Sequence, residues 1–84
     1  MADEKWVVYI LECGDGSLYT GMTNDLERRL QAHRAGDGAK YTRGRCPLVL
    51  RYTEYCDSRS LALRREYEIK SLSRTRKLAL CNNA

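Results

Sequence analysis

The sequence predicts an α+β, or mixed α/β, fold in which helices flank a small three-stranded sheet. Two observations predict it. Strand-like and helix-like segments follow one another in the order β-β-α-β-α-α. The chain has only 84 residues, and no linker, internal repeat or low-complexity tract divides it. We therefore expect a single domain over residues 1–84.

The first two strands are predicted to form an antiparallel hairpin. Residues 6–13, WVVYILEC, are rich in β-branched and aromatic types, which is typical of a strand buried on much of both faces. Residues 14–17, GDGS, interrupt this run, and residues 18–22, LYTGM, resume it. Such an interruption between two strand-like runs is a hairpin signal.

The length of the hairpin loop decides whether Tyr9 and Tyr19 share a face. A two-residue turn at Asp15-Gly16 would place the tyrosines on opposite faces, because side chains alternate along a strand. A three-residue loop would place them on one face. Gly16 suits the left-handed position that the longer loop needs. The sequence permits the convergent register without requiring it.

A helix is predicted over residues 24–35, capped by Thr23 or Asn24 and ended by the glycine-rich residues 35–38. Leu26 and Leu30 share one face of it. A basic loop follows over residues 39–46, and a third strand is predicted over residues 47–56. A second helix, capped by Asp57 or Ser58, is expected to run to about residue 71, and a short last helix is expected over residues 74–81.

Polar residues on the two longer helices are candidates for function. Arg29 and His33 are four residues apart, so they share a helix face. A lone histidine beside an apolar stripe is more often structural than catalytic. In the second helix, Glu66 and Glu68 flank the apolar stripe, and periodicity does not choose between them. Glu66 also pairs with Lys70 at the spacing of an ordinary surface ion pair.

The net charge is +4 and is unevenly distributed. Residues 1–27 carry one lysine and six acidic residues, a balance of −5. Residues 28–84 carry fourteen basic and five acidic residues, a balance of +9. A basic surface suits a polyanion such as nucleic acid, but a solvated surface without a partner explains the charge equally well.

The composition predicts a cytoplasmic protein without a membrane partner. No apolar run approaches the roughly 20 residues that span a bilayer. The start of the chain, MADEKW, is acidic and lacks the apolar region of a signal peptide. The cysteines form no C-x-x-C pair, so we expect reduced structural thiols rather than a zinc site or disulfides. They are Cys13, Cys46, Cys56 and Cys81.

The order and spacing of these candidates resemble the GIY-YIG nuclease superfamily. The resemblance covers about residues 6–80 and is closest to a small, single-domain bacterial subfamily whose members are mostly uncharacterised. Residues 7–9, VVY, match the first signature, and residues 19–21, YTG, match the second. Residues 24–33 match the arginine-bearing helix, with Arg29 as the family arginine. Residues 62–66 match the segment that carries the metal-binding glutamate, which selects Glu66.

The sequence departs from the family pattern in two places. Val7 replaces the glycine of the first signature, and Thr20 replaces the isoleucine of the second. Both departures leave the tyrosines in place. The chain also lacks an appended DNA-recognition domain, so we expect a protein partner to supply target recognition.

The resemblance implies a Mg²⁺-dependent endonuclease that hydrolyses DNA phosphodiester bonds, with a structure-specific role in DNA repair or recombination. One tyrosine, with Tyr9 favoured, would be the general base toward the attacking water, and Tyr19 would orient the water or the phosphate. Arg29 would hold the scissile phosphate, and His33 would assist proton transfer or contact the phosphate. Glu66 would hold Mg²⁺ or Mn²⁺.

Basic residues from the loop and the C-terminal half are expected to contact the nucleic-acid backbone, and one loop tyrosine is expected to stack on a base. The expected contacts are Lys40, Tyr41, Arg43, Arg45, Lys70, Arg74, Arg76 and Lys77. Two alternatives to a nuclease stay open. One is a noncatalytic nucleic-acid-binding module that keeps the fold, and the other is a small protein-interaction domain.

Overall fold

The computed structural model describes residues 5–82, and its elements follow the predicted order. One additional short 3₁₀ turn lies within the basic loop. The elements are β1 (Trp6–Glu12), β2 (Leu18–Thr23), α1 (Leu26–Arg34), η1 (Lys40–Thr42), β3 (Val49–Cys56), α2 (Arg59–Lys70) and α3 (Arg74–Asn82).

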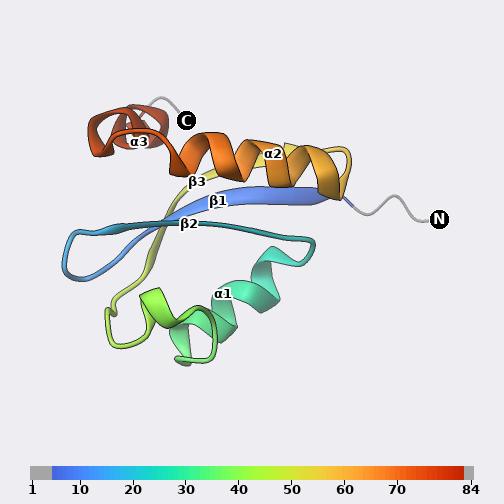
Figure 1. The fold of residues 1–84 in the computed structure, drawn as a ribbon. Helices are drawn as coiled ribbons and strands as arrows, with labels where there is room; N and C mark the ends of the chain where they lie inside the picture. The colour runs from blue at the N-terminus through green and yellow to red at the C-terminus, as the bar shows by residue number, and fades with distance from the viewer. Residues whose placement is uncertain (1–4, 83–84) are drawn as a thin grey trace.

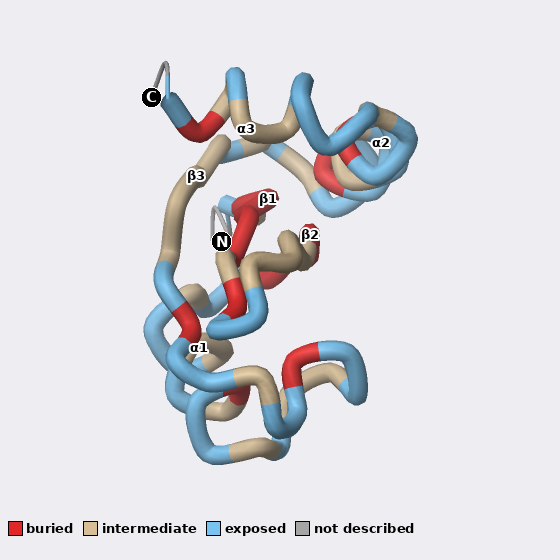
Figure 2. The backbone as a smooth tube through the Cα atoms, turned by 90° about the vertical axis from the view of Figure 1, so that its left-hand side faces the viewer, coloured by how far each residue is buried: buried red, intermediate tan, exposed pale blue. Residues whose placement is uncertain are grey.

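The three strands form one antiparallel sheet in the order β2-β1-β3. Figure 1 shows α1 and the segment after it on one side of the sheet, and α2 and α3 on the other. Helix α2 packs on β1 and β2, whereas α3 contacts β3. The predicted α+β class and the antiparallel hairpin are therefore confirmed. Strand β2 is an edge strand, and the sheet lies between α2 and α1 (Figure 2).

The central strand β1 is covered on both faces, as predicted for it. Its residues 7–11 are at most 2% exposed. Val8 and Ile10 pack against Ala62 and Ile69 in the layer under α2. The intervening residues of β1 point to the opposite face, toward α1, because side chains alternate along a strand. Tyr9 belongs to this second face, together with the buried His33 and Thr42.

The first helix is capped by Asp25, so the prediction of Thr23 or Asn24 was wrong. The Asp25 carboxylate accepts a hydrogen bond from the backbone N–H of Arg28 at 3.2 Å. Thr23 Oγ1 instead accepts the N–H of Asp25 at 3.1 Å. This local turn at residues 23–25 shifts the N-cap of α1 to Asp25, one residue after Asn24. The second helix is capped by Ser58, which was one of its two predicted caps.

The third strand begins at Val49, two residues later than predicted, and the last helix ends at Asn82. Within residues 5–82, no helix is both long enough and apolar enough to cross a membrane.

Candidate active site

The hairpin loop has three residues, Gly14–Gly16, and this length places Tyr9 and Tyr19 on one face of the sheet. Leu11 lies directly opposite Tyr19, which is the convergent register. Gly16 adopts φ +87°, in the left-handed region that favours glycine. The two tyrosine rings are diagonal neighbours with centroids 6.3 Å apart.

Gly21 makes this approach of the two rings possible. It lies opposite Tyr9 in the hairpin. A Cβ atom at this position would lie 2.6 Å from the Tyr9 hydroxyl oxygen and 2.9 Å from Tyr19 Cε2. No real side chain fits at such distances. Residue 21 matched the second signature, but the sequence pattern did not reveal that its missing side chain is what lets the tyrosines meet.

Helix α1 brings His33 against Tyr9. The Tyr9 hydroxyl lies 2.9 Å from His33 Nε2, and the two rings meet edge to face. Tyr19 also contacts the imidazole, with ring centroids 5.3 Å apart. His33 is only 1% exposed. Its other ring nitrogen, Nδ1, lies 2.8 Å from Thr42 Oγ1. The histidine is therefore enclosed behind the tyrosines and has no free face for a ligand.

Arg29 lies one turn before His33 and reaches both tyrosines. Its interaction with the Tyr9 hydroxyl is the main cause that raises the pKa of Arg29, and Tyr19 acts in the same direction. Both tyrosines thus favour the charged form of the Arg29 guanidinium. Its Nε–H is buried and has no hydrogen-bond partner among the described residues, so it is a free donor at this point.

The buried groups shift one another's protonation. Desolvation raises the pKa of Tyr9 to about 12, although Arg29 acts in the opposite direction. Burial, followed by the positive charge of Arg29, lowers the pKa of His33 below its ordinary value. At neutral pH the pair is therefore an uncharged tyrosine beside an uncharged imidazole.

Glu66 lies on α2, which packs on the other side of the sheet from α1. Its side chain is 18% exposed and forms an ion pair with Lys70 at 3.6 Å. The negative charge of Glu66 contributes to the raised pKa of Tyr9, so its carboxylate acts on the tyrosine site. Glu68 points elsewhere and pairs with Arg65 at 3.3 Å. The structure thus separates the two glutamates that periodicity left equivalent.

The donor set around Glu66 suits a hard, strongly hydrated cation. Residues 5–82 contain no group of three or more His, Cys, Asp or Glu side chains that could hold a metal ion. Among the predicted catalytic residues, Glu66 alone offers a carboxylate. Mg²⁺ is often held by only one or two carboxylates, with water and substrate phosphate completing its coordination.

The basic loop folds back onto the hairpin through Tyr41 and Arg45. The ring of Tyr41 is 42% exposed and lies 5.8 Å from that of Tyr19, measured between centroids. The Arg45 guanidinium lies 4.5 Å from the Tyr41 ring centroid and also forms an ion pair with Asp15 of the hairpin loop. These contacts place the exposed ring of Tyr41 beside the half-buried ring of Tyr19.

The other residues predicted to bind nucleic acid come from two layers of the molecule. Lys40 and Arg43 lie in the segment below the sheet, and the rest lie on α2 and α3 above it (Figure 1). Most of them are exposed. They are Lys40, Arg43, Lys70, Arg74, Arg76 and the half-buried Lys77.

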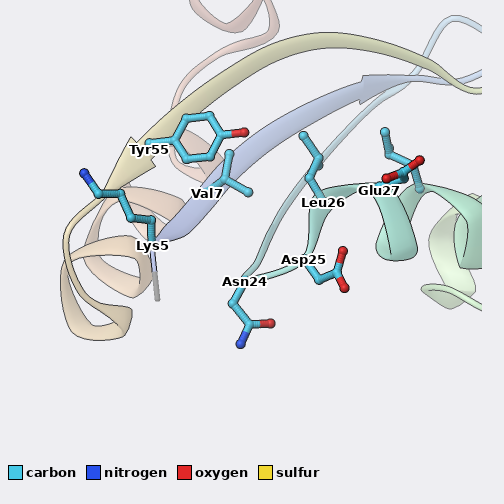
Figure 3. A pocket seen from close by; sticks show the side chains of 8 residues that line it. Lys5, Val7, Asn24, Asp25, Leu26, Glu27 and Tyr55 are labelled. Atoms are coloured by element: carbon cyan, nitrogen blue, oxygen red, sulfur yellow. The ribbon is translucent and has the colours of Figure 1, made fainter. Parts of the chain in front are cut away.

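A small hollow of about 230 Å³ lies beside Arg29. Its wall also includes Arg28 and Ala32 of the same helix and the turn at residues 23–25. A larger hollow of about 500 Å³ lies at the start of α1 (Figure 3). Val7 and Tyr55 line it from the sheet and Leu26 from the helix. The larger hollow includes none of the predicted catalytic residues.

This arrangement of two tyrosines, an arginine and a glutamate on a three-stranded sheet defines a class of nuclease domain. Residues 5–79 match the GIY-YIG catalytic domain, and the chain belongs to this family. The match spans almost the whole chain and includes every predicted catalytic residue.

The relatives place the chain among the UPF0213 proteins. It is 63% identical over 73 residues to the UPF0213 protein of Halobacterium salinarum, which covers 87% of this chain and 95% of that protein. It is 53% identical over 77 residues to the UPF0213 protein of Staphylococcus saprophyticus, covering 92% of this chain and 94% of that protein.

A solved structure shares the fold. The solution NMR structure of the UPF0213 protein BH0048 from Bacillus halodurans has a TM-score of 0.60 and 52% identity, covering 93% of this chain and 83% of that one. The predicted resemblance to the GIY-YIG superfamily is therefore confirmed.

Proposed function

We propose that this protein is a Mg²⁺-dependent endonuclease that hydrolyses phosphodiester bonds of DNA. The observation that carries the proposal is the packing of Tyr9, Tyr19 and His33 against one another on one face of the sheet. Arg29 and Glu66 act electrostatically on the same tyrosine, Tyr9. Phosphodiester hydrolysis needs an activated water, a group that neutralises the phosphorane charge and a stabilised leaving oxygen.

Tyr9 is the general base of this proposal. It is the tyrosine whose proton has an acceptor, because His33 Nε2 lies 2.9 Å from its hydroxyl. A phenol with a pKa of about 12 is a poor base by itself at neutral pH. Passing its own proton to the imidazole while it takes one from water removes this difficulty. His33 thus assists from behind and needs no contact with the substrate.

Arg29 and Tyr19 bind the scissile phosphate. The Nε–H of Arg29 has no partner among the described residues, and its planar guanidinium suits phosphate oxygens. Tyr9 is fully buried in this structure, so water reaches its hydroxyl only when Arg29 moves toward the bound phosphate.

Glu66 is the residue that would hold the metal ion. When bound, Mg²⁺ supplies charge stabilisation at the leaving oxygen. The same carboxylate forms the ion pair with Lys70 at 3.6 Å, so holding a cation would require this pair to open. Lys70 is then free to contact the DNA backbone.

The exposed basic residues on both sides of the sheet bind the DNA backbone in this proposal, and Tyr41 stacks on a base next to the cut. In this proposal, target choice comes from DNA structure or from a protein partner. Branched intermediates of repair or recombination are the substrates we propose.

The test incubates the purified protein with supercoiled, branched and single-stranded DNA, in Mg²⁺ or in chelator. Wild type is compared with Tyr9→Phe and Glu66→Ala, with Glu68→Ala as the matched control. Glu68 lies on the same helix and pairs with Arg65 instead. We expect cleavage only with Mg²⁺, a loss of about 10²–10⁴-fold in Tyr9→Phe, a comparable loss in Glu66→Ala and near-normal cleavage in the control.

Two outcomes contradict the proposal in different ways. Wild-type protein that binds DNA but cuts no substrate would identify the noncatalytic nucleic-acid-binding module. Wild-type rates in both variants would show that the chemistry lies elsewhere on the molecule.

A further inference from the structure

Thr42 is a buried residue that no motif singled out, and it contacts the imidazole of His33. It lies at the end of η1, is 1% exposed and is flanked by the exposed Tyr41 and Arg43. Its hydroxyl oxygen lies 2.8 Å from His33 Nδ1 and 3.0 Å from the backbone carbonyl oxygen of Ala39. The Thr42 side chain is therefore buried within a basic surface loop, where its hydroxyl contacts His33 and Ala39.

The single hydroxyl proton of Thr42 decides which nitrogen of His33 carries hydrogen. The Thr42 O–H donates to the carbonyl oxygen of Ala39 at 3.0 Å, an oxygen that also accepts the backbone N–H of Thr42 at 3.1 Å. The Thr42 oxygen is then left with acceptor capacity alone, and His33 Nδ1 must be the N–H donor to it. In a neutral imidazole one nitrogen donates and the other accepts. Nε2 is therefore the unprotonated nitrogen.

The other end of this chain of hydrogen bonds leads independently to the same assignment. Arg29 interacts with the Tyr9 hydroxyl, and a guanidinium has donors only. The Tyr9 oxygen accepts from Arg29, so its own proton needs a different acceptor. His33 Nε2, at 2.9 Å, accepts it only if Nε2 carries no hydrogen. Both ends of the network thus select the Nδ1–H tautomer.

Gly38 lets the loop approach the ring closely enough for this contact. A Cβ atom at residue 38 would lie 2.4 Å from His33 Nδ1. The loop backbone consequently passes against the imidazole, and Thr42 reaches Nδ1 from the same segment.

We propose that Thr42 is a positioning residue that holds His33 in the Nδ1–H tautomer, so that Nε2 is free to accept the proton of Tyr9. The effect on cleavage rests on the proposed nuclease function, whereas the tautomer does not. In the proton transfer, water gives a proton to the Tyr9 oxygen and the Tyr9 proton passes to Nε2. The hydroxide attacks phosphorus as the P–O bond to the leaving oxygen breaks, and the leaving oxygen departs as an alkoxide that takes a proton from solvent water. The resulting imidazolium keeps its Nδ1–H bond to Thr42 and donates Nε2–H to Tyr9.

The test is the ¹⁵N spectrum of the imidazole in ¹⁵N-labelled full-length protein at neutral pH. His33 is the only histidine, so its two ring nitrogens are assigned without ambiguity. We expect Nδ1 in the protonated range and Nε2 in the unprotonated range. Thr42→Val keeps the side-chain shape but accepts no hydrogen bond. It should populate the Nε2–H form in part, because only the Tyr9 end of the network then favours Nδ1–H. Thr42→Ser keeps the hydroxyl and should restore the wild-type spectrum.

The cleavage rate should follow the tautomer, with a fall of about tenfold or more in Thr42→Val and recovery in Thr42→Ser. Amide spectra of both variants check that the fold is intact. A wild-type His33 protonated on Nε2 overturns the inference. An unchanged tautomer in Thr42→Val also overturns it, whatever the cleavage rate of that variant. If the tautomer is as expected but no DNA is cut, the nuclease function fails and the inference stands.

Discussion

Replacing Gly21 with alanine adds a single methyl group at the place where the two tyrosines meet. The added Cβ would lie 2.6 Å from the Tyr9 hydroxyl oxygen and 2.7 Å from its Cζ. Ordinary contacts between such atoms exceed about 3.4 Å, so the Tyr9 ring or strand β2 must shift by roughly 1 Å. Tyr9 is fully buried against His33 and cannot move outward.

This overpacking should cost about 1–3 kcal/mol of the free energy of unfolding. In a domain of this size, each kcal/mol lowers Tm by roughly 4–8 °C. A displacement of about 1 Å at the reacting groups lowers a catalysed rate by about 10²-fold. The measurements are urea unfolding followed by circular dichroism, and cleavage of the best DNA substrate at a temperature where the variant is folded.

Gly16→Ala is the matched control. It adds the same methyl group where no heavy atom lies within 4 Å, at φ +87°. It should therefore lose about 1–2 kcal/mol through backbone strain alone and keep its cleavage rate. If Gly21→Ala were as stable and as active as wild type, the close approach of the tyrosines would not govern the site.

Two further predictions concern pH and salt. Burial and Arg29 lower the pKa of His33 below its ordinary value near 6.5, so the unfolded chain binds the proton more readily than the folded one. The contribution of His33 to the free energy of unfolding should be fully present above about pH 6.5 and should be lost as the pH drops toward the folded-state pKa. The measurement is the urea midpoint at several pH values. The midpoint should decline less with falling pH in His33→Gln than in wild type. An equal decline in both proteins would contradict the assignment. DNA affinity should fall steeply with salt, and Lys40→Ala should reduce the log–log slope by about 1. Lys5→Ala, which removes a lysine paired with Asp57, should leave the slope unchanged, and equal slopes in all three proteins would contradict the role of Lys40.

The order of elements was predictable because each segment carries its own local pattern. Residues 6–13 have the β-branched and aromatic composition of a buried strand, and the burial of β1 on both faces confirms this prediction. Periodicity predicted the positions of the helices, but the N-cap predicted for α1 was wrong. The cap of α1 is Asp25, because a turn made by Thr23 shifts the start of the helix.

The sequence alone determined the element order, the family and the set of candidate residues, because these depend on local pattern and on motif spacing. The tertiary structure decided which candidates meet. A three-residue hairpin loop, one of two that the sequence allowed, puts Tyr9 and Tyr19 together. Long-range packing then distinguishes Glu66 from Glu68 and brings Thr42 to His33. Local patterns do not reveal such contacts, because each contact joins side chains that are far apart in the sequence. Only the packing of the helices on the sheet sets the relative positions of these segments.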